Sequence, residues 1–271
     1  MEPKPDPQLQ IVEEDPDQLV VNKPAGLVCH PTKKGPLSSL IGRLRLHLGA
    51  EAEVHFVNRL DRETGGLVLI AKNRNRAVQL RKVWEAHTVK KEYFAIVHGH
   101  VSQAEGTIDA PLGKDLGSRV VIKDCVRADG AEAQTDFQVD QRFVRAKRPF
   151  SLLRIFPRTG RKHQIRIHLN HLGHPIVGDK IYGGDEELYL AFVEERLTDA
   201  QRQTLILPCH ALHAVRLSIP WMGGTLEYES TPADWFTRFH QTASGTEESE
   251  DNQWKTESHM DSNGTMRTPG A

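Results

Sequence analysis

The stretch His55-Phe-Val-Asn-Arg-Leu-Asp-Arg-Glu-Thr-Gly-Gly-Leu-Val-Leu-Ile-Ala-Lys72 combines two patterns. Its second half is a short apolar run, 66–71, entered through a pair of glycines, which predicts a buried strand. Its first half gathers four charged residues beside that strand, namely Arg59, Asp61, Arg62 and Glu63. Because neighbouring cations favour the ionised form of a carboxyl group, Asp61 is predicted to be a carboxylate. It can then serve as a nucleophile, as a base or as half of a salt bridge.

The segments around this strand predict an α+β fold. Strands are expected over 10–14, 19–22, 89–97, 119–123, 132–139, 151–156 and 225–229. Helices are expected over 37–48, 73–86, 165–172, 186–195 and 233–239. Strands outnumber helices and rarely alternate with them in a regular series. We therefore expect a mixed, mostly antiparallel central sheet with flanking helices and an active-site cleft across the sheet.

Composition separates a basic body from two polar ends. Residues 1–18 hold six acids and one base, and residues 241–271 hold six acids and two bases. The net charge of the whole chain is nevertheless only −1. The body is therefore basic, which favours a polyanionic partner. We expect disorder over 1–9, one domain over 10–240 and a disordered tail over 241–271.

The remaining composition favours a cytoplasmic monomer. The three cysteines are scattered and form no CxxC pair, which is typical of reduced thiols. We find no apolar run long enough to span a membrane and no secretory leader, so neither membrane insertion nor export is expected.

The motif Arg59-Leu-Asp-Arg-Glu-Thr-x-Gly-Leu67 resembles the catalytic motif of the RluA-like pseudouridine synthases, which isomerise uridine to pseudouridine in RNA. Asn58 and Gly65 replace the histidine and serine usual in that family. Further stretches resemble other motifs of the family, namely 22–31, Lys91-x-Tyr93, 158–183 and 211–220. Because these motifs begin near residue 20, the N-terminal S4 module of some relatives is not expected here.

The resemblance implies a role for several residues. Asp61 would be the catalytic nucleophile, Tyr93 would stack on the target base and assist proton transfer, and Arg166 would pair with Asp61 and orient it. Substrate binding is expected from seven further residues: Arg59, Arg62, Lys91, Arg161, Lys162, His163 and Gln164. The reaction involves no redox step, so no cofactor and no metal are expected. The partner would be ribosomal or transfer RNA.

One segment is strongly basic. Between residues 142 and 178 there are nine lysines or arginines and no acid, a pattern that predicts contact with phosphate. Four histidines in the same segment suggest a metal site, namely His163, His168, His171 and His174. Their spacing does not converge well on one side of a helix, and no carboxylate accompanies them, so we expect no metal there.

Three other interpretations of the central stretch remain open. Asp61 can belong to a purely structural salt bridge. Asp61 and Glu63 can form the carboxyl pair of a retaining glycosidase, although a basic surface does not suit a neutral sugar. The chain can also be an RNA-binding module without catalytic activity, an interpretation that the intact set of Asp61, Tyr93 and Arg166 disfavours.

Overall fold

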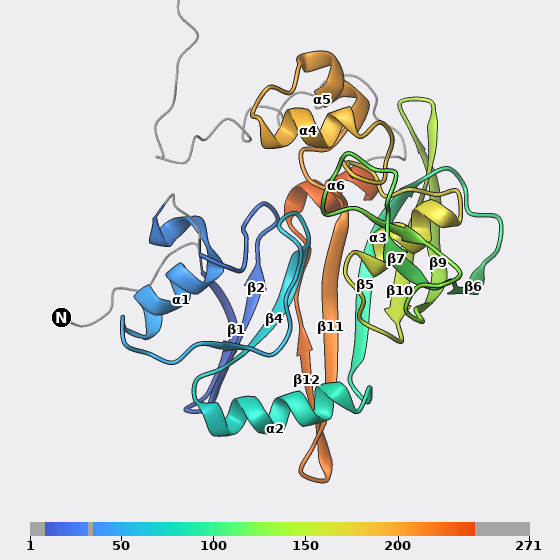
Figure 1. Ribbon diagram of the computed structural model, residues 1–271. Coiled ribbons are helices and arrows are strands. Elements are labelled where there is room, and N and C mark those ends of the chain that lie inside the picture. The colour runs from blue at the N-terminus through green and yellow to red at the C-terminus, as the bar shows by residue number, and fades with distance from the viewer. Residues whose placement is uncertain (1–8, 32–34, 242–271) are drawn as a thin grey trace, which may run out of the picture.

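A ten-stranded mixed sheet runs through the computed structural model, which describes residues 9–31 and 35–241 (Figure 1). Its main path is β1 (Gln10–Glu14), β2 (Gln18–Lys23), β4 (Gly65–Ala71), β11 (Leu212–Trp221), β5 (Lys90–His98), β10 (Arg148–Pro157), β9 (Gln134–Arg145) and β6 (Glu105–Asp109). Strand β12 (Gly224–Glu229) pairs with β11, and β3 (His55–Phe56) pairs with β4. Strands β7 (Leu112–Lys114) and β8 (Asp124–Val126) form a separate hairpin. Among these pairs only β4 and β11 run parallel, so the prediction of a mostly antiparallel α+β fold is confirmed.

Helices flank the sheet and the loops beside it (Figure 1). They are the 3₁₀ helix Pro36–Ser38, α1 (Leu40–Leu48), α2 (Arg74–Glu85), α3 (Gln164–His171), α4 (Glu187–Val193), α5 (Asp199–Leu205) and α6 (Asp234–Gln241). Helix α2 begins as predicted, because the Asn73 side chain accepts the Arg76 backbone N–H at 2.8 Å and so caps the first turn.

Strand β4 is fully buried because helices cover both of its faces. Val68 and Ile70 lie in one apolar cluster with Leu40 and Leu44 of α1. The alternate residues of β4 lie in a second cluster with Ala77 and Leu80 of α2. Burial on two faces explains why the strand is an unbroken apolar run rather than an alternating one.

Gly66 allows β11 to approach β4. It has a φ of 110°, and a Cβ atom at this position would lie 2.3 Å from the carbonyl oxygen of Ala214. A side chain would therefore push the two strands apart at the one parallel pairing of the sheet. The glycine pair that marks the start of β4 in the sequence thus has a packing reason in the fold.

Two sequence predictions are wrong. The segment 119–123 is a loop rather than a strand, because Glu186 accepts the Arg119 backbone N–H at 3.1 Å and pairs with Lys123 at 2.7 Å. The helix expected from Leu37 begins only at Leu40, after Ser39 has capped it, and Leu37 is 57% exposed. Strands β3, β6, β7 and β8 and helix α5 were not predicted.

The disorder predicted for the two ends falls almost entirely outside the described residues. Of those segments, Leu9 is half-buried against the cluster around α1, and Gln241 is the last residue of α6. Among the described residues, we find no helix long and apolar enough to cross a membrane.

Candidate active site

Asp61 lies in a turn directly before β4, and the backbone of this turn is tightly held. The Arg62 carbonyl accepts the Gly26 N–H at 2.9 Å and the Lys23 ammonium at 3.1 Å. Lys23 is 1% exposed and also donates to the carbonyls of Pro24 and Leu27. Burial lowers the pKa of Lys23 to about 8. The turn therefore fixes the backbone of Asp61 while its side chain remains 30% exposed.

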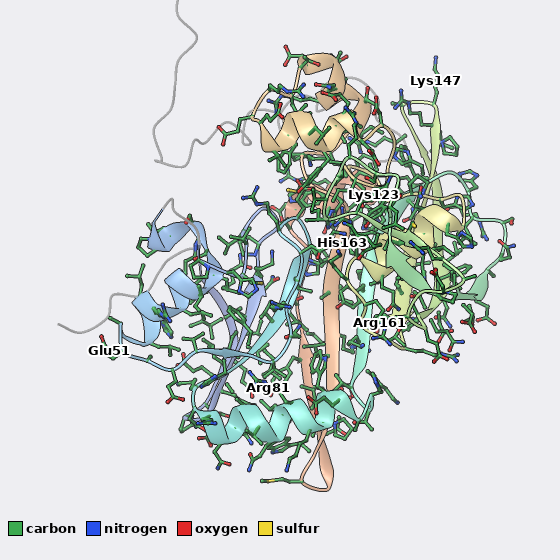
Figure 2. All side chains as sticks on the ribbon, viewed as in Figure 1. Glu51, Arg81, Lys123, Lys147, Arg161 and His163 are labelled. Carbon is green, nitrogen blue, oxygen red and sulfur yellow. The ribbon has the colours of Figure 1, made fainter. Side chains whose placement is uncertain are left out.

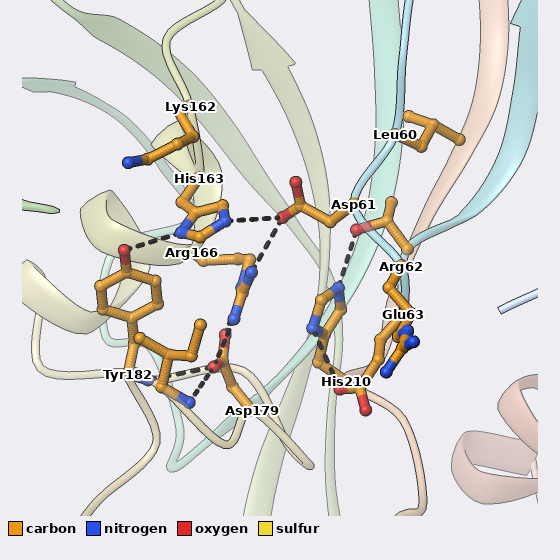
Figure 3. A network of polar contacts seen from close by, with 12 residues as sticks. Leu60, Asp61, Arg62, Glu63, Lys162, His163, Arg166, Asp179, Tyr182 and His210 are labelled. Atoms are coloured by element: carbon orange, nitrogen blue, oxygen red, sulfur yellow. Dashed lines mark hydrogen bonds and ion pairs between the residues drawn. The ribbon is translucent and has the colours of Figure 1, made fainter. Parts of the chain in front are cut away.

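Arg166 of α3 joins Asp61 to a second, buried carboxylate. Its Nη1 donates to Oδ2 of Asp61 at 2.8 Å, which places the two residues together as the sequence predicted (Figure 3). Its Nε and Nη2 donate to the two oxygens of Asp179 at 2.6 and 2.8 Å. Asp179 is itself fixed, since its Oδ1 accepts the backbone N–H groups of Ile181 and Tyr182. The guanidinium is thus held in one plane by a bidentate pair before it reaches Asp61.

Electrostatics keep Asp61 ionised. Burial raises the pKa of Asp61, but the charge and hydrogen bond of Arg166, together with the nearby His163 and His210, outweigh it and hold the pKa below its usual range. The same balance lowers the pKa of Asp179, where burial is again opposed by Arg166. The outcome is a permanent cation between two carboxylates, of which only Asp61 is accessible.

Tyr93 of β5 reaches the same region. It packs between the cluster around α1 and the largest apolar cluster of the molecule. Burial raises the pKa of Tyr93, and the negative charge of Asp61 raises it further, so the phenol keeps its proton. Lys91, two residues earlier, donates to the carbonyl of Thr159 at 3.3 Å, and its burial lowers its pKa.

His163 stands immediately before α3 and faces Asp61. Its Nε2 lies 3.8 Å from Oδ2 of Asp61, and its Nδ1 lies 2.9 Å from the Tyr182 hydroxyl (Figure 3). Its backbone is left-handed, with a φ of 55°, and its side chain is 8% exposed. The imidazole is therefore fixed between a phenol and the carboxylate.

Of the other predicted substrate-binding residues, Arg59 and Arg62 are exposed beside Asp61. Arg59 donates to the ring of His30 at 2.6 Å, and the Arg62 guanidinium lies 5.9 Å from the centre of the Phe192 ring. Both cations lie in the same turn as the carboxylate.

Of the remaining three predicted residues, Arg161 and Lys162 belong to the turn before α3, and Gln164 is the first residue of α3. Arg161 donates to the Glu132 carbonyl at 3.0 Å, and Lys162, 49% exposed, pairs with Asp124 at 2.7 Å. Gln164 differs from them because it is buried and its amide bonds only to protein groups, such as Thr159 and Thr135. Its geometry suits shaping the turn rather than contacting a ligand.

A second buried network lies below Asp61 and was not predicted. Lys180 pairs with Glu63 at 2.6 Å and donates to the Pro208 carbonyl. The His210 ring lies 2.7 Å from the Thr64 hydroxyl, and burial lowers the pKa of His210 to about 3, so it is neutral. One signal was available in the sequence: Asp179 and Lys180 directly follow the acid-free segment 142–178.

The histidines of that segment separate in the fold. His168 lies between Thr135 and the Ala110 carbonyl, at 2.8 and 2.9 Å, and His174 lies 2.8 Å from the His98 carbonyl. Within residues 9–31 and 35–241, no group of three or more histidines, cysteines or acids is placed to hold a metal ion.

Comparison with known proteins gives a consistent result. The family model described as RNA pseudouridylate synthase matches residues 17–171. A protein of Bacillus subtilis named "Uncharacterized RNA pseudouridine synthase YjbO" is 39% identical over 182 residues, which is 66% of this chain and 62% of that protein. The "Dual-specificity RNA pseudouridine synthase RluA" of Vibrio parahaemolyticus is 40% identical over 186 residues, covering 68% of this chain and 73% of the relative.

The fold shows the same likeness. The solved structure named "Human RNA Pseudouridylate Synthase Domain Containing 1" superposes with a TM-score of 0.69 at 27% identity, covering 94% of this chain and 96% of that one. The matches to two relatives from Bacillus subtilis span only about three fifths of their length, 62% and 60%. The family model spans more than half of the chain and includes both Asp61 and Arg166. This chain therefore belongs to the RNA pseudouridylate synthase family, and within it to the RluA-like group.

Proposed function

We propose that this protein isomerises uridine to pseudouridine in structured RNA, ribosomal or transfer, with Asp61 as the nucleophile. The observation that carries the proposal is the arrangement of Asp61, partly exposed and ionised, against an arginine that Asp179 locks in place. A reacting group fixed in this way needs no reorganisation when the substrate arrives.

The chemistry needs little beyond this arrangement. The N1–C1′ bond of uridine breaks, a C5–C1′ bond forms, C5 loses a proton and N1 gains one, so the oxidation state does not change. A carboxylate must reach C1′ or C6, and a flat apolar surface must hold the uracil while it turns. Asp61 supplies the first, and Tyr93 is our candidate for the second, with a protonated phenol available for proton transfer.

The cations near Asp61 are our candidates for RNA contact. Arg59 and Arg62 lie in the same turn as Asp61 and are exposed, so they can help to draw the target nucleotide out of its stack. Lys91, Arg161 and Lys162 surround the turn before α3 and can bind the flanking phosphates. All three cysteines are free thiols, which supports our proposal that the protein is cytoplasmic. We also propose that it is a monomer.

The geometry disfavours the glycosidase alternative. Glu63 is buried and pairs with Lys180, while Asp61 is partly exposed and pairs with Arg166. Burial also raises the pKa of Glu63. A retaining glycosidase needs both carboxyl groups at the same sugar, and here the two groups have separate partners.

The test is Asp61→Asn. The amide keeps the shape and one acceptor for Arg166 but is not a nucleophile, so RNA binding should persist and pseudouridine formation should cease. The measurement is single-turnover formation of pseudouridine in uridine-containing RNA, beside a binding assay with the same RNA. Turnover by pure Asp61→Asn protein would refute the assignment, and inactivity of the unmodified protein on total cellular RNA would refute the function itself.

A further inference from the structure

Three groups connect the start of strand β8 to Asp61, the proposed nucleophile: the Asp124 backbone N–H, the Tyr182 hydroxyl and the His163 ring. The backbone N–H of Asp124 donates to the Tyr182 hydroxyl at 3.3 Å. The same hydroxyl lies 2.9 Å from Nδ1 of His163, and Nε2 of that ring lies 3.8 Å from Oδ2 of Asp61. The ring can carry its proton on either nitrogen when neutral, so the direction of these bonds decides what Asp61 faces.

The Tyr182 phenol determines which nitrogen of the His163 ring accepts a hydrogen bond. A backbone N–H can only donate, so the Tyr182 oxygen accepts from Asp124. The phenol has one proton left to donate, and among the described residues the one acceptor within reach of it is Nδ1 of His163. Burial raises the pKa of Tyr182, which keeps that proton on the oxygen. Nδ1 therefore carries the lone pair and Nε2 carries the hydrogen.

The Asp61 carboxylate favours the same tautomer of His163. Asp61 is ionised beside Arg166, so its Oδ2 is an acceptor. The opposite tautomer would turn a lone pair toward this negative oxygen, which is unfavourable at 3.8 Å. Tyr182 and Asp61 thus both favour the tautomer of His163 that has its N–H on Nε2.

Neighbouring side chains hold the three hydrogen-bonded residues, Asp124, Tyr182 and His163, in place. The Asp124 side chain pairs with Lys162 at 2.7 Å, which ties the first donor to the residue before His163. Cζ of Arg166 lies 5.1 Å from the centre of the Tyr182 ring. The His163 side chain is only 8% exposed, which leaves its ring little freedom. Catalytic hydrogen bonds are often long before a substrate binds, so 3.8 Å is compatible with a contact that shortens in the complex.

We propose that His163 is a positioning residue that acts as a neutral donor, turning its Nε2–H toward Asp61, and that Tyr182 sets this tautomer. Asp61 then has two fixed donors, Arg166 and His163, which together define the direction in which its free lone pairs face the uridine. The tautomer follows from the hydrogen-bond geometry and the charge of Asp61, whereas its effect on rate rests on the proposed function.

The first test measures the tautomer directly by ¹⁵N–¹H correlation of histidine side chains in the full-length protein at neutral pH. The His163 signals are identified by their absence from His163→Gln protein. We expect a neutral ring with hydrogen on Nε2 and none on Nδ1, and we expect the pattern to change in Tyr182→Phe. A hydrogen on Nδ1, or a cationic ring, overturns the proposal whatever the activity of the protein.

The second test compares two replacements of His163 by unbranched residues, which strain the left-handed backbone at this position to a similar degree. His163→Gln can still offer an N–H near the position of Nε2, whereas His163→Met cannot. At saturating RNA we expect the glutamine variant to retain turnover within about tenfold, the scale of one hydrogen bond. The methionine variant should lose about a hundredfold, the scale of a misplaced reacting group.

Equal rates for the methionine variant and the unmodified protein overturn the positioning role. Tyr182→Phe keeps the ring under Arg166, so the variant should still fold. It loses the hydroxyl that sets the tautomer of His163, so its turnover should fall by about tenfold. If the expected tautomer is found but no protein, unmodified or variant, converts uridine, then the proposed function fails and the assignment of the tautomer stands.

Discussion

Arg166 uses its donors unequally. Two of its three nitrogens serve Asp179, which is inaccessible, and the third serves Asp61. The arginine itself is 5% exposed. A guanidinium is planar and keeps its charge, so this division of donors sets an orientation that a flexible ammonium group does not reproduce.

Arg166→Lys should therefore separate binding from chemistry. The charge remains and the residue does not reach solvent, so RNA affinity and its dependence on salt should be unchanged. Turnover at saturating RNA should fall by about a hundredfold, because Asp61 loses its fixed donor. Single-turnover rates and binding curves at several salt concentrations measure both quantities. Arg154→Lys is the control, since Arg154 also pairs with a carboxylate, but with Glu92 rather than Asp61. Normal turnover by Arg166→Lys would contradict this view of the pair.

Asp179→Asn should show where the stability of the site comes from. The pKa of Asp179 lies below its ordinary value of 3.8, so ionised Asp179 stabilises the fold above that pH. This contribution is lost as the pH falls through the lower, folded-state pKa. At pH 7 the variant should be less stable by about 3 kcal/mol, as expected for breaking a buried ion pair. Urea unfolding at stepwise lower pH should show the difference shrinking below about pH 4. A difference independent of pH would exclude a role for the charge.

At the scale of elements, the loop between α3 and α4 joins two parts of the site. Asp179 anchors Arg166 of α3, and the next residue, Lys180, anchors Glu63 in the turn before β4. The alternate residues Asp61 and Glu63 thus pair with Arg166 and Lys180. One dipeptide of the loop therefore sets the position of the turn that carries Asp61, the proposed nucleophile.

The pair of Glu63 and Lys180 should behave as a coupled unit. Lys180→Met leaves Glu63 buried without its cation and should cost about 3–5 kcal/mol of unfolding free energy. Adding Glu63→Gln should recover part of this loss, because no unpaired charge then remains. A double-mutant cycle from urea unfolding should give a coupling energy above about 1 kcal/mol. Additive losses would show that the two side chains do not depend on each other.

The hairpin of β9 and β10 is the element we expect to extend the RNA surface. Lys147 and Arg148 are exposed at its turn, and Lys147 points away from the body of the protein (Figure 2). Arg81 is equally exposed but lies on α2, which follows the end of β4 opposite to Asp61. These positions give a test pair for electrostatic binding of phosphate.

Replacing both hairpin cations with alanine should weaken RNA binding and lower the salt slope by about one unit for each cation that binds a phosphate. Turnover of bound RNA should persist, because neither residue is near Asp61. Arg81→Ala serves as the control and should change neither quantity. Binding titrations at three or more salt concentrations provide the measurement. A loss of affinity in the control and not in the hairpin variant would move the RNA surface to α2.

For the molecule as a whole, the sequence indicated the centre of the site better than its support. The apolar run of β4 and the charged motif before it are local patterns, so the strand could be predicted, and the family motifs indicated that Arg166 meets Asp61. The contacts that matter for the site are Lys23 with Arg62, Lys180 with Glu63, and Asp179 with Arg166, which join separate segments of the chain. No local periodicity of the sequence indicates such contacts.

In the basic segment 142–178, the sequence alone overestimates the charge that is available to RNA. Its sequence has no acid, yet four of its cations pair with carboxylates from elsewhere in the fold, namely Arg154 with Glu92, Arg158 with Asp136, Lys162 with Asp124, and Arg166 with Asp61 and Asp179. The charge available to RNA is therefore smaller than the count of nine suggests. Counting charges along a chain overestimates a binding surface when the partners come from other strands.

The position of β11 has a consequence for biogenesis. Strands β4 and β5 follow each other in the chain, but β11 lies between them in the sheet and pairs with both. While a ribosome makes the roughly hundred residues that separate β5 from β11, both strands expose open edges, on the order of ten seconds at ordinary elongation rates. Open edges of this kind invite wrong pairing and aggregation. We therefore expect the nascent chain to be protected from aggregation by chaperones until β11 (Leu212–Trp221) has been made and can cover both edges.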